Sequence, residues 1–439
     1  MHAYNARIAG FGGLFSGAIE FDEETGKIVA FHKSITPKED DIDCNGALLL
    51  PGAIDGHVHF RDPGQPQKED FGSGSSGAIA GGVTTVIDMP NTAPSIDSLE
   101  RLESKRAAVA PKAKCDYSFY FGGGKSNSEE SAKAAANEAV AGLKIYMGSS
   151  TGDLLADTVE AAYNHFTGFK GKPIAVHAED EQLIQLCSKH CRDEGDKNHN
   201  RARPAFAAPS SAARALAMAQ ESGRRLHVVH ASTEGEVELV RVAKRRGLEV
   251  SMEVCPHHLF LGEKDQARLG AYGKMNPPLR DSRDVAALWN ALNEGVVDTI
   301  ATDHAPHTRE EKDAGFFSAP SGVPGVQTMM PLLLSAALDG RTTIDRVVRF
   351  ACANPAKIFG LRDKLFSPGS DADFAIFEEG EFNLKGVEME SRCGWTPYEG
   401  MTVKARPAKV FLRGKLAFED GAVIAKGGDG KLARLVERV

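Results

Sequence analysis

Long hydrophobic runs are missing from this sequence: none approaches the roughly 20 consecutive apolar residues that a membrane helix needs. Residues 1–13 also lack the charged start and apolar core of a secretory signal. Lysine and arginine are scattered and the formal net charge is -8, which argues against the basic surface of a nucleic-acid-binding protein. We therefore expect a cytoplasmic protein without a membrane span and without a nucleic-acid partner.

Cysteine is also scarce, with 7 residues in a chain of 439. The number is odd and the positions are dispersed, which suits reduced thiols better than a disulfide framework. Cys187 and Cys191 are the closest pair, but no second pair of ligands lies near them in the sequence. We therefore expect no structural zinc site at this pair.

What is present is an alternation of short β-branched or aromatic runs with longer stretches rich in Ala, Leu, Glu and Lys. This alternation is typical of repeated β-α units. The predicted strands are Ala53–His59, Thr84–Met89, Asp116–Phe121, Gly142–Met147, Pro173–Ala178, Leu226–Ala231, Leu248–Val254 and Thr299–Thr302. The predicted helices between them include Ser98–Ala108, Ser128–Ala141, Ser210–Ser222, Gly235–Arg246 and Ala286–Gly295. Eight strands with helical crossovers predict an α/β protein built on a (β/α)8 TIM-type barrel.

The two ends of the chain differ from the middle because both carry short strand-like runs without intervening helices. Examples are Ala18–Phe21 and Lys27–Phe31 near the start, and Asp373–Phe377 and Ala408–Leu412 near the end. We therefore predict that residues 1–50 and 366–439 together form a small β-sandwich domain. Residues 51–365 are predicted to form the barrel as the catalytic domain.

The strongest local signal is a His-x-His pair, His57 and His59, at the end of the first barrel strand. Residues two apart in a strand point to the same side, so both imidazoles can bind one metal ion. His177, His230 and Asp303 lie at the ends of other predicted strands, and barrel enzymes place their chemistry at that edge. The set predicts a metal site, in which Asp303 also serves as the catalytic group that takes and returns protons.

Lys144 lies inside the apolar fourth strand, where burial should lower the pKa of its amine. A neutral amine can add carbon dioxide, and the resulting carbamate could bridge two metal ions. A lysine ion-paired to a buried carboxylate fits the sequence equally well. The residues alone leave these two interpretations open.

Further polar residues on loops after the strands could select a substrate. Arg61 follows His59 by two positions, and a guanidinium binds carboxylates in a bidentate way. Asn91, Asn276 and His307 add amide and imidazole groups, although turn or cap roles would also explain the asparagines. Together they describe a pocket for a small, anionic, amide-bearing molecule. His257 and His258 end the seventh strand, where we expect them to support the metal ligands rather than to bind the metal.

Several segments together resemble dihydroorotases of the amidohydrolase superfamily, over essentially the whole chain. They are Asp55-Gly-His-Val-His-Phe-Arg-Asp-Pro-Gly64, Asp88-Met-Pro-Asn-Thr92, Gly142-Leu-Lys-Ile-Tyr146, Val176-His-Ala-Glu179, Pro256-His-His-Leu259, Lys274-Met-Asn-Pro-Pro-Leu-Arg280, Ala301-Thr-Asp-His-Ala-Pro-His307 and Gly322-Val-Pro-Gly325. The resemblance implies reversible cyclisation of N-carbamoyl-L-aspartate to L-dihydroorotate, a step of de novo pyrimidine synthesis. It also implies the barrel with a β-sandwich domain.

Matched residue by residue, the family pattern implies two zinc ions per subunit, bridged by carboxylated Lys144. The implied metal ligands are His57, His59, Lys144, His177, His230 and Asp303. The implied substrate-binding residues are Arg61, Asn91, Asn276 and His307, with main-chain groups near Ser321 and Gly322. The partner hypotheses are a homodimer and an association with aspartate carbamoyltransferase. The second rests on the fact that some dihydroorotases dock onto a carbamoyltransferase.

Three alternatives share parts of this pattern. Allantoinases and dihydropyrimidinases resemble the chain in the metal ligands, and both open cyclic amides. They lack the sequence context of Arg61 and Asn276. Arg61 has a reason to be present only if the substrate carries a carboxylate for it to bind. A non-catalytic scaffold is the third alternative, but such relatives have typically lost metal ligands, and here every ligand is present.

Overall fold

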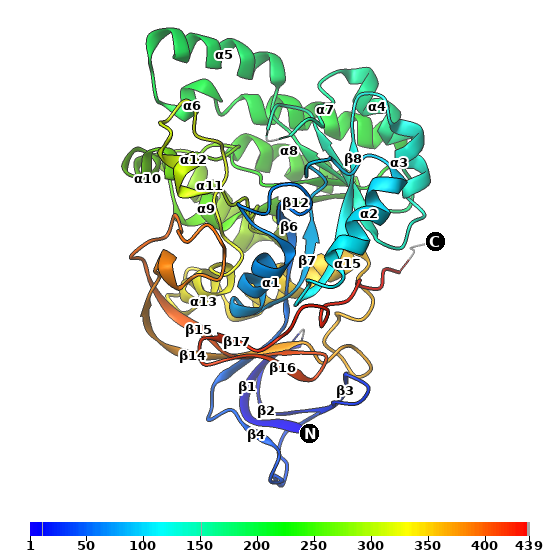
Figure 1. The fold of residues 1–439 in the computed structure, drawn as a ribbon, viewed down its shortest axis with the longest axis vertical. Helices are drawn as coiled ribbons and strands as arrows, with labels where there is room; N and C mark the ends of the chain where they lie inside the picture. Colours follow the sequence, from blue (N-terminus) through cyan, green and yellow to red (C-terminus); the bar gives the residue numbers. More distant parts are fainter. Residues whose placement is uncertain (11, 151, 437–439) are drawn as a thin grey trace.

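Eight parallel strands form the barrel that the sequence predicts (Figure 1). The computed structural model describes residues 1–10, 12–150 and 152–436. The barrel strands follow chain order: β6 (Ala53–Val58), β7 (Val83–Asp88), β8 (Asp116–Gly123), β9 (Val140–Tyr146), β10 (Ile174–His177), β11 (Leu226–Val228), β12 (Val250–Val254) and β13 (Thr299–Ile300). The segment after β13 nearly closes the ring, because His59 N donates to His304 O over 2.8 Å beside a parallel bridge at Val58.

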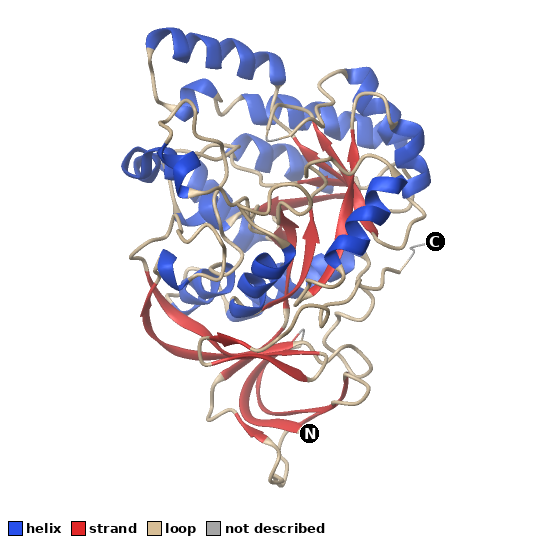
Figure 2. Cartoon of the chain, in the orientation of Figure 1, coloured by secondary structure: helices blue, strands red, loops and turns tan. Residues whose placement is uncertain are grey.

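Helices surround the barrel (Figure 2). They are α1 (Phe71–Ala80), α2 (Leu99–Val109), α3 (Ser128–Ala134), α4 (Val159–Gly168), α5 (Glu181–Glu194), α6 (His199–Ala202), α7 (Ala207–Ser222), α8 (Glu234–Arg245), α9 (Pro256–Phe260), α10 (Glu263–Leu269), α11 (Ser282–Glu294), α12 (Arg309–Asp313), α13 (Met329–Leu338), α14 (Ile344–Val348) and α15 (Asn354–Phe359), with shorter turns at Gly270–Gly273, Arg349–Ala353 and Gly386–Glu388. Side-chain caps explain several of the helix starts: Ser98 accepts from Arg101 N, and Thr233 accepts from Glu236 N. No helix in the described ranges is long and apolar enough to cross a membrane.

The predicted helix Ser128–Ala141 is wrong in its second half. Helix α3 ends at Ala134, and the chain enters strand β9 at Val140. Asn137 makes the turn between them, where its side chain accepts a hydrogen bond from Ala139 N over 2.9 Å. Alanine favours a helix locally, but here Ala139 and Ala141 are fully buried at the barrel wall, and this burial overrides local propensity.

The two ends of the chain combine into a separate nine-stranded sheet, called the annex sheet below. Its strands are β1 (His2–Gly10), β2 (Gly13–Asp22), β3 (Lys27–His32), β4 (Ile42–Asp43), β5 (Leu48–Pro51), β14 (Phe374–Asn383), β15 (Thr402–Leu412), β16 (Lys415–Glu419) and β17 (Ala422–Val423). Strand β5 pairs with β14 in antiparallel fashion and joins the early strands to the late ones. The Phe21 and Phe374 rings lie 5.3 Å apart although β2 and β14 are not neighbours, so the sheet folds over its own apolar core. The exact domain boundaries stay a prediction.

Candidate metal centre

The carboxyl ends of the barrel strands bring together side chains that are far apart in the sequence. The group consists of the six predicted ligands, His57, His59, Lys144, His177, His230 and Asp303, all of them 3% exposed or less except His59 and Asp303. The imidazole rings form a continuous row. Ring centroids are 5.3 Å apart for His59 and His57, 5.4 Å for His57 and His230, and 4.7 Å for His230 and His177. Strand alternation explains why His57 and His59 share this side.

Within this group the donor atoms are spaced as ligands of a metal ion would be. Asp303 Oδ1 lies 2.9 Å from His59 Nε2 and 3.2 Å from His57 Nε2. His177 Nδ1 lies 2.9 Å from His230 Nε2. Metal–nitrogen bonds of about 2.0–2.1 Å place neighbouring ligand atoms roughly 3.0–3.4 Å apart. The observed spacings are close to this range, so the donor set fits metal binding at two adjacent positions.

The outer ring nitrogens of three histidines are held by oxygen acceptors. His57 Nδ1 lies 2.8 Å from Glu253 Oε1, and His177 Nε2 lies 3.2 Å from Glu179 Oε2. His59 Nδ1 lies 2.6 Å from Asn91 Oδ1. When the outer N–H donates to such an acceptor, the lone pair of the inner nitrogen points toward the cluster. Each of these three imidazoles is therefore oriented as a ligand.

Lys144 is fully buried within this cluster. Its Nζ has no hydrogen-bond partner among the described residues and lies 4.9 Å from the centre of the Tyr146 ring. Burial lowers the pKa of Lys144 to about 8, against the opposing effect of Asp303 and Glu253. A buried amine without an acceptor is costly as a cation. The geometry thus favours the neutral amine over the ion-paired lysine that the sequence left open.

Asp303 keeps its negative charge in this environment. Burial acts to raise the pKa of Asp303, but His57 and His59 outweigh it and hold the pKa well below its usual value. Asp303 and His230 both have positive backbone φ angles, 48° and 38°, which L-residues adopt at a cost of about 1–3 kcal/mol. The surrounding contacts hold both residues in place against this strain.

Buried Asp55 links the first and last barrel strands directly beneath the cluster. Its Oδ1 accepts from Thr302 N over 3.0 Å and from His57 N over 3.2 Å, and its Oδ2 accepts from Thr302 Oγ1 over 2.5 Å. These bonds fix His57 relative to the residue before Asp303. Asp55 therefore positions donors from opposite ends of the barrel sequence.

A cluster of basic side chains, called the basic cluster below, adjoins the predicted metal ligands through Arg61. The Arg61 guanidinium is buried, with Nη2 3.2 Å from His307 Nε2 and Nε donating to Pro306 O over 3.3 Å. Lys68 Nζ lies 3.3 Å from the other ring nitrogen of His307. No carboxylate among the described residues lies within ion-pair distance of Arg61, and burial lowers the pKa of this guanidinium. The basic cluster thus holds a buried cation, Arg61, that lacks a counterion among the described residues.

The remaining predicted substrate residues lie in three different settings. Ser321 O lies 3.1 Å from His307 Nε2, and Gly322 follows with φ +141°, where a Cβ would lie 2.6 Å from Ala305 O. Both therefore border the basic cluster. Asn276 instead contacts His199, whose Nε2 lies 2.9 Å from Asn276 Oδ1. Asn91 contacts a predicted metal ligand, as described above.

Sequence reasoning missed four residues that support the site: Glu179, Arg203, Glu253 and Asp55. Arg203 Nε donates to Glu179 Oε2 over 3.0 Å, and Glu253 Oε1 also accepts from His230 N over 2.9 Å. Glu253 lies inside the apolar run of β12, just as Lys144 lies inside β9. A charged residue inside a predicted buried strand was therefore the signal that could have identified Glu253. Arg203 gave no comparable signal because its loop position depends on the tertiary fold.

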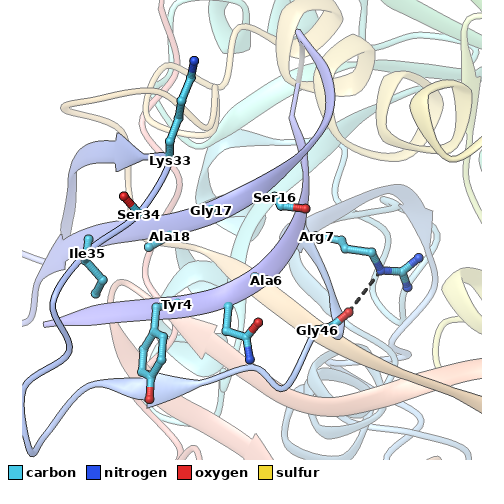
Figure 3. A pocket seen from close by; sticks show the side chains of 11 residues that line it. Tyr4, Ala6, Arg7, Ser16, Gly17, Ala18, Lys33, Ser34, Ile35 and Gly46 are labelled. Atoms are coloured by element: carbon cyan, nitrogen blue, oxygen red, sulfur yellow. Dashed lines mark hydrogen bonds between the residues drawn. The ribbon is translucent and has the colours of Figure 1, made fainter.

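A hollow with a volume of about 290 Å³ lies on the annex sheet, away from the predicted ligands (Figure 3). Tyr4, Arg7 and Lys33 are among its lining residues, and Arg7 Nε donates to Gly46 O over 3.1 Å. The lining includes none of the predicted metal ligands or substrate residues. The chemistry-bearing residues therefore gather at the barrel mouth rather than in this hollow.

Comparison with known proteins agrees with this fold. The sequence model described as "Amidohydrolase family" matches residues 48–417. The chain therefore belongs to the amidohydrolase family.

Within that family, its curated relatives include dihydroorotases. The dihydroorotase of Methanosarcina acetivorans is 38% identical over 424 residues, which cover 93% of this chain and 90% of that protein. The multifunctional protein CAD of Squalus acanthias is 36% identical over 398 residues, which cover 90% of this chain and 16% of CAD. Among solved structures, the L-hydantoinase (dihydropyrimidinase) of Arthrobacter aurescens superposes with a TM-score of 0.94 at 30% identity, covering 99% of both chains.

Proposed function

We propose that this chain catalyses the reaction of dihydroorotases, the reversible cyclisation of N-carbamoyl-L-aspartate to L-dihydroorotate. The observation that carries the proposal is the buried Arg61 guanidinium without a protein counterion, two residues from the predicted ligand His59. Both of these substrates carry a carboxylate that such a guanidinium can bind in a bidentate way. Dihydroorotase relatives at 34–38% identity support the same activity.

The residues at the barrel mouth fit two zinc ions per subunit. His57, His59 and Asp303 would hold one ion and His177 and His230 the other, with Lys144 as a bridging carbamate. Such ions, when bound, polarise a carbonyl oxygen and lower the pKa of a water molecule. The partnerless amine of Lys144 supports the carbamate because addition of carbon dioxide would convert it into an anionic ligand.

Asp303 is proposed to move the proton between the attacking group and the ring nitrogen. Its carboxylate is ionised at neutral pH because His57 and His59 lower its pKa against the effect of burial. Arg61 and His307 would orient the substrate carboxylate so that the reacting amide faces Asp303. The buried surroundings would exclude bulk water from both contacts.

Asp303→Ala is expected to lower kcat by at least 100-fold, the lower end of the usual effect of a general acid-base residue. Because the side chain is a predicted ligand as well, metal content must be measured on the same sample. Circular dichroism and thermal unfolding serve as the control for folding. Turnover within tenfold of the wild type would overturn the proton-transfer role.

The function itself is tested by turnover of L-dihydroorotate, allantoin and dihydrouracil by the purified protein, before and after chelation and zinc addition. We expect opening of dihydroorotate alone, lost on chelation and restored by zinc. Activity only on allantoin or dihydrouracil would favour those alternatives, which the structural likeness to a hydantoinase keeps relevant. If the metal-loaded protein turned over none of these substrates, the result would favour the alternative that the chain is a non-catalytic scaffold.

A homodimer and association with aspartate carbamoyltransferase stay predictions. The match to a multifunctional protein supports looking for association, because the related segment makes up only 16% of that longer chain. Sedimentation of the purified chain, alone and with aspartate carbamoyltransferase, is the direct test.

A further inference from the structure

A second group of metal-binding side chains lies at the end of β12, beside the proposed catalytic centre. Cys255 follows the strand directly, and His257 and His258 lie in the first turn of α9. Each of the three offers a ligand atom within 4.8 Å of the others, and each residue is at most 2% exposed. We call Cys255, His257 and His258 the thiol–imidazole triad.

The hydrogen bond of His258 leaves one of its two ring nitrogens without a partner. His258 Nε2 donates to Pro277 O over 3.1 Å, so Nδ1 carries the lone pair. Nδ1 is buried and has no hydrogen-bond partner among the described residues. A buried acceptor without a donor is costly, and a carbonyl that holds the outer N–H is the usual support for a metal-binding histidine.

The other two members complete a soft ligand set. The His257 and His258 ring centroids are 4.3 Å apart at an interplanar angle of 68°, so the edge of one ring packs against the face of the other. Cys255 is a free, fully buried thiol. One thiolate with two imidazoles suits zinc or another thiophilic divalent ion, with a fourth position open. By contrast, the proposed catalytic ligands contain no sulfur.

We propose that the thiol–imidazole triad binds one thiophilic divalent ion, separate from the two ions of the proposed catalytic centre. On binding, the Cys255 thiol gives up its proton to solvent and its sulfur coordinates the ion. The triad directly follows β12, the strand that contains Glu253, and the Glu253 carboxylate holds His57. An ion in the triad would therefore fix the end of the strand that supports a predicted catalytic ligand.

Cobalt(II) distinguishes this site because a cobalt–thiolate bond gives a near-ultraviolet charge-transfer band that nitrogen and oxygen ligands do not give. Chelator-stripped full-length protein is titrated with cobalt(II) chloride. We expect the final intensity of the band to correspond to one thiolate-bound ion per chain, with up to three cobalt ions bound in total, and we expect zinc to bleach the band. No band at saturating cobalt would overturn the proposal.

Three variants assign the band. Cys255→Ser should abolish it. His258→Gln should weaken cobalt binding at least tenfold, because the glutamine amide can still donate to Pro277 O but offers no Nδ1 lone pair. Cys44→Ser removes a buried thiol of the annex sheet and should leave the band unchanged. A band that persists in Cys255→Ser, or that depends on Cys44, would contradict the triad.

Dihydroorotate turnover measured on the same cobalt-loaded samples separates this proposal from the proposed function. A band without turnover would contradict the proposed function and support the triad. Turnover without a band would contradict the triad and support the proposed function. Circular dichroism of Cys255→Ser and His258→Gln shows that a lost band reflects a lost ligand rather than unfolding.

Discussion

Two buried basic side chains at the barrel mouth lack an acidic partner in the part of the chain that the structure describes. Lys144 Nζ has no hydrogen-bond acceptor, and Arg61 has no carboxylate within ion-pair distance, among the described residues. Neither group stabilises the fold, because burying a charge without a partner is energetically unfavourable. Each fits a partner in the proposed function: carbon dioxide and metal for Lys144, and a substrate carboxylate for Arg61.

Replacing Arg61 with methionine tests the second partner. Loss of a hydrogen bond to a charged group costs about 1.5–3 kcal/mol, so KM for L-dihydroorotate should rise roughly 10- to 150-fold. Zinc content and circular dichroism of the variant provide the controls for metal loading and folding. An unchanged KM for L-dihydroorotate in the folded, zinc-loaded variant would reject the carboxylate contact.

The low pKa of Lys144 predicts how zinc reconstitution depends on pH. With a pKa of about 8 instead of 10.5, the neutral fraction at pH 7 is roughly 300 times larger. At fixed dissolved carbon dioxide, the recovery rate of the stripped protein should rise about tenfold per pH unit below pH 8 and level off above it. Recovery of turnover measures this rate.

Lys144→Met is the matched variant, because it keeps the length of the side chain without an amine. It should show no dependence of zinc uptake on carbon dioxide. Wild-type recovery that is independent of carbon dioxide across this pH range would count against the carbamate.

At the scale of secondary-structure elements, a buried ion pair holds α2 against the end of β7. Lys105 Nζ bonds Asp88 and also donates to Met89 O over 3.2 Å, and both charged side chains are fully buried. The other carboxylate oxygen of Asp88 accepts from Phe60 N over 2.8 Å. The pair thus ties helix, strand and the loop that carries Arg61 into one arrangement.

Lys105→Met should lower the free energy of unfolding by about 3–5 kcal/mol, because it leaves the Asp88 carboxylate buried without its cation. Arg101→Met on the same helix is the control. Arg101 pairs with Asp97 over 2.6 Å at the surface, with side chains 46% and 32% exposed, so its loss should cost less than about 1 kcal/mol. Urea unfolding gives both values, and equal losses would contradict the argument.

At the scale of the whole molecule, a charge cluster joins the barrel to the annex sheet. Lys364 Nζ donates to Asp116 over 2.5 Å, to Asp371 over 2.9 Å and to Asp373 over 2.5 Å. Asp116 begins barrel strand β8, whereas Asp373 directly precedes annex strand β14. Arg413 adds a further bond to Asp116. These three carboxylates are spaced as metal ligands, but Lys364 Nζ already bonds all three of them.

Removal of this lysine should therefore destabilise the whole chain. Lys364→Met is expected to cost about 3–5 kcal/mol of unfolding free energy, since three carboxylates would share fewer cations. Lys409→Met provides the matched control, because Lys409 pairs with Glu419 at the surface of the annex sheet and should contribute less than about 1 kcal/mol. Denaturant unfolding followed by circular dichroism measures the difference. A loss below 1 kcal/mol for Lys364→Met would show that the cluster does not hold the two parts together.

The sequence by itself determined the barrel, the annex strands from both termini and the strand-end positions of the predicted ligands. It could do so because strand periodicity and strand-end placement are local properties. Tertiary structure decided what local patterns cannot encode. Alanines of the predicted helix Ser128–Ala141 entered a buried strand, and Glu179 and Glu253 turned out to orient His177 and His57. Only the tertiary structure shows that Lys144 and Arg61 are buried without an acidic partner among the described residues. Burial and counterions depend on residues far away in the chain, so local patterns cannot encode them.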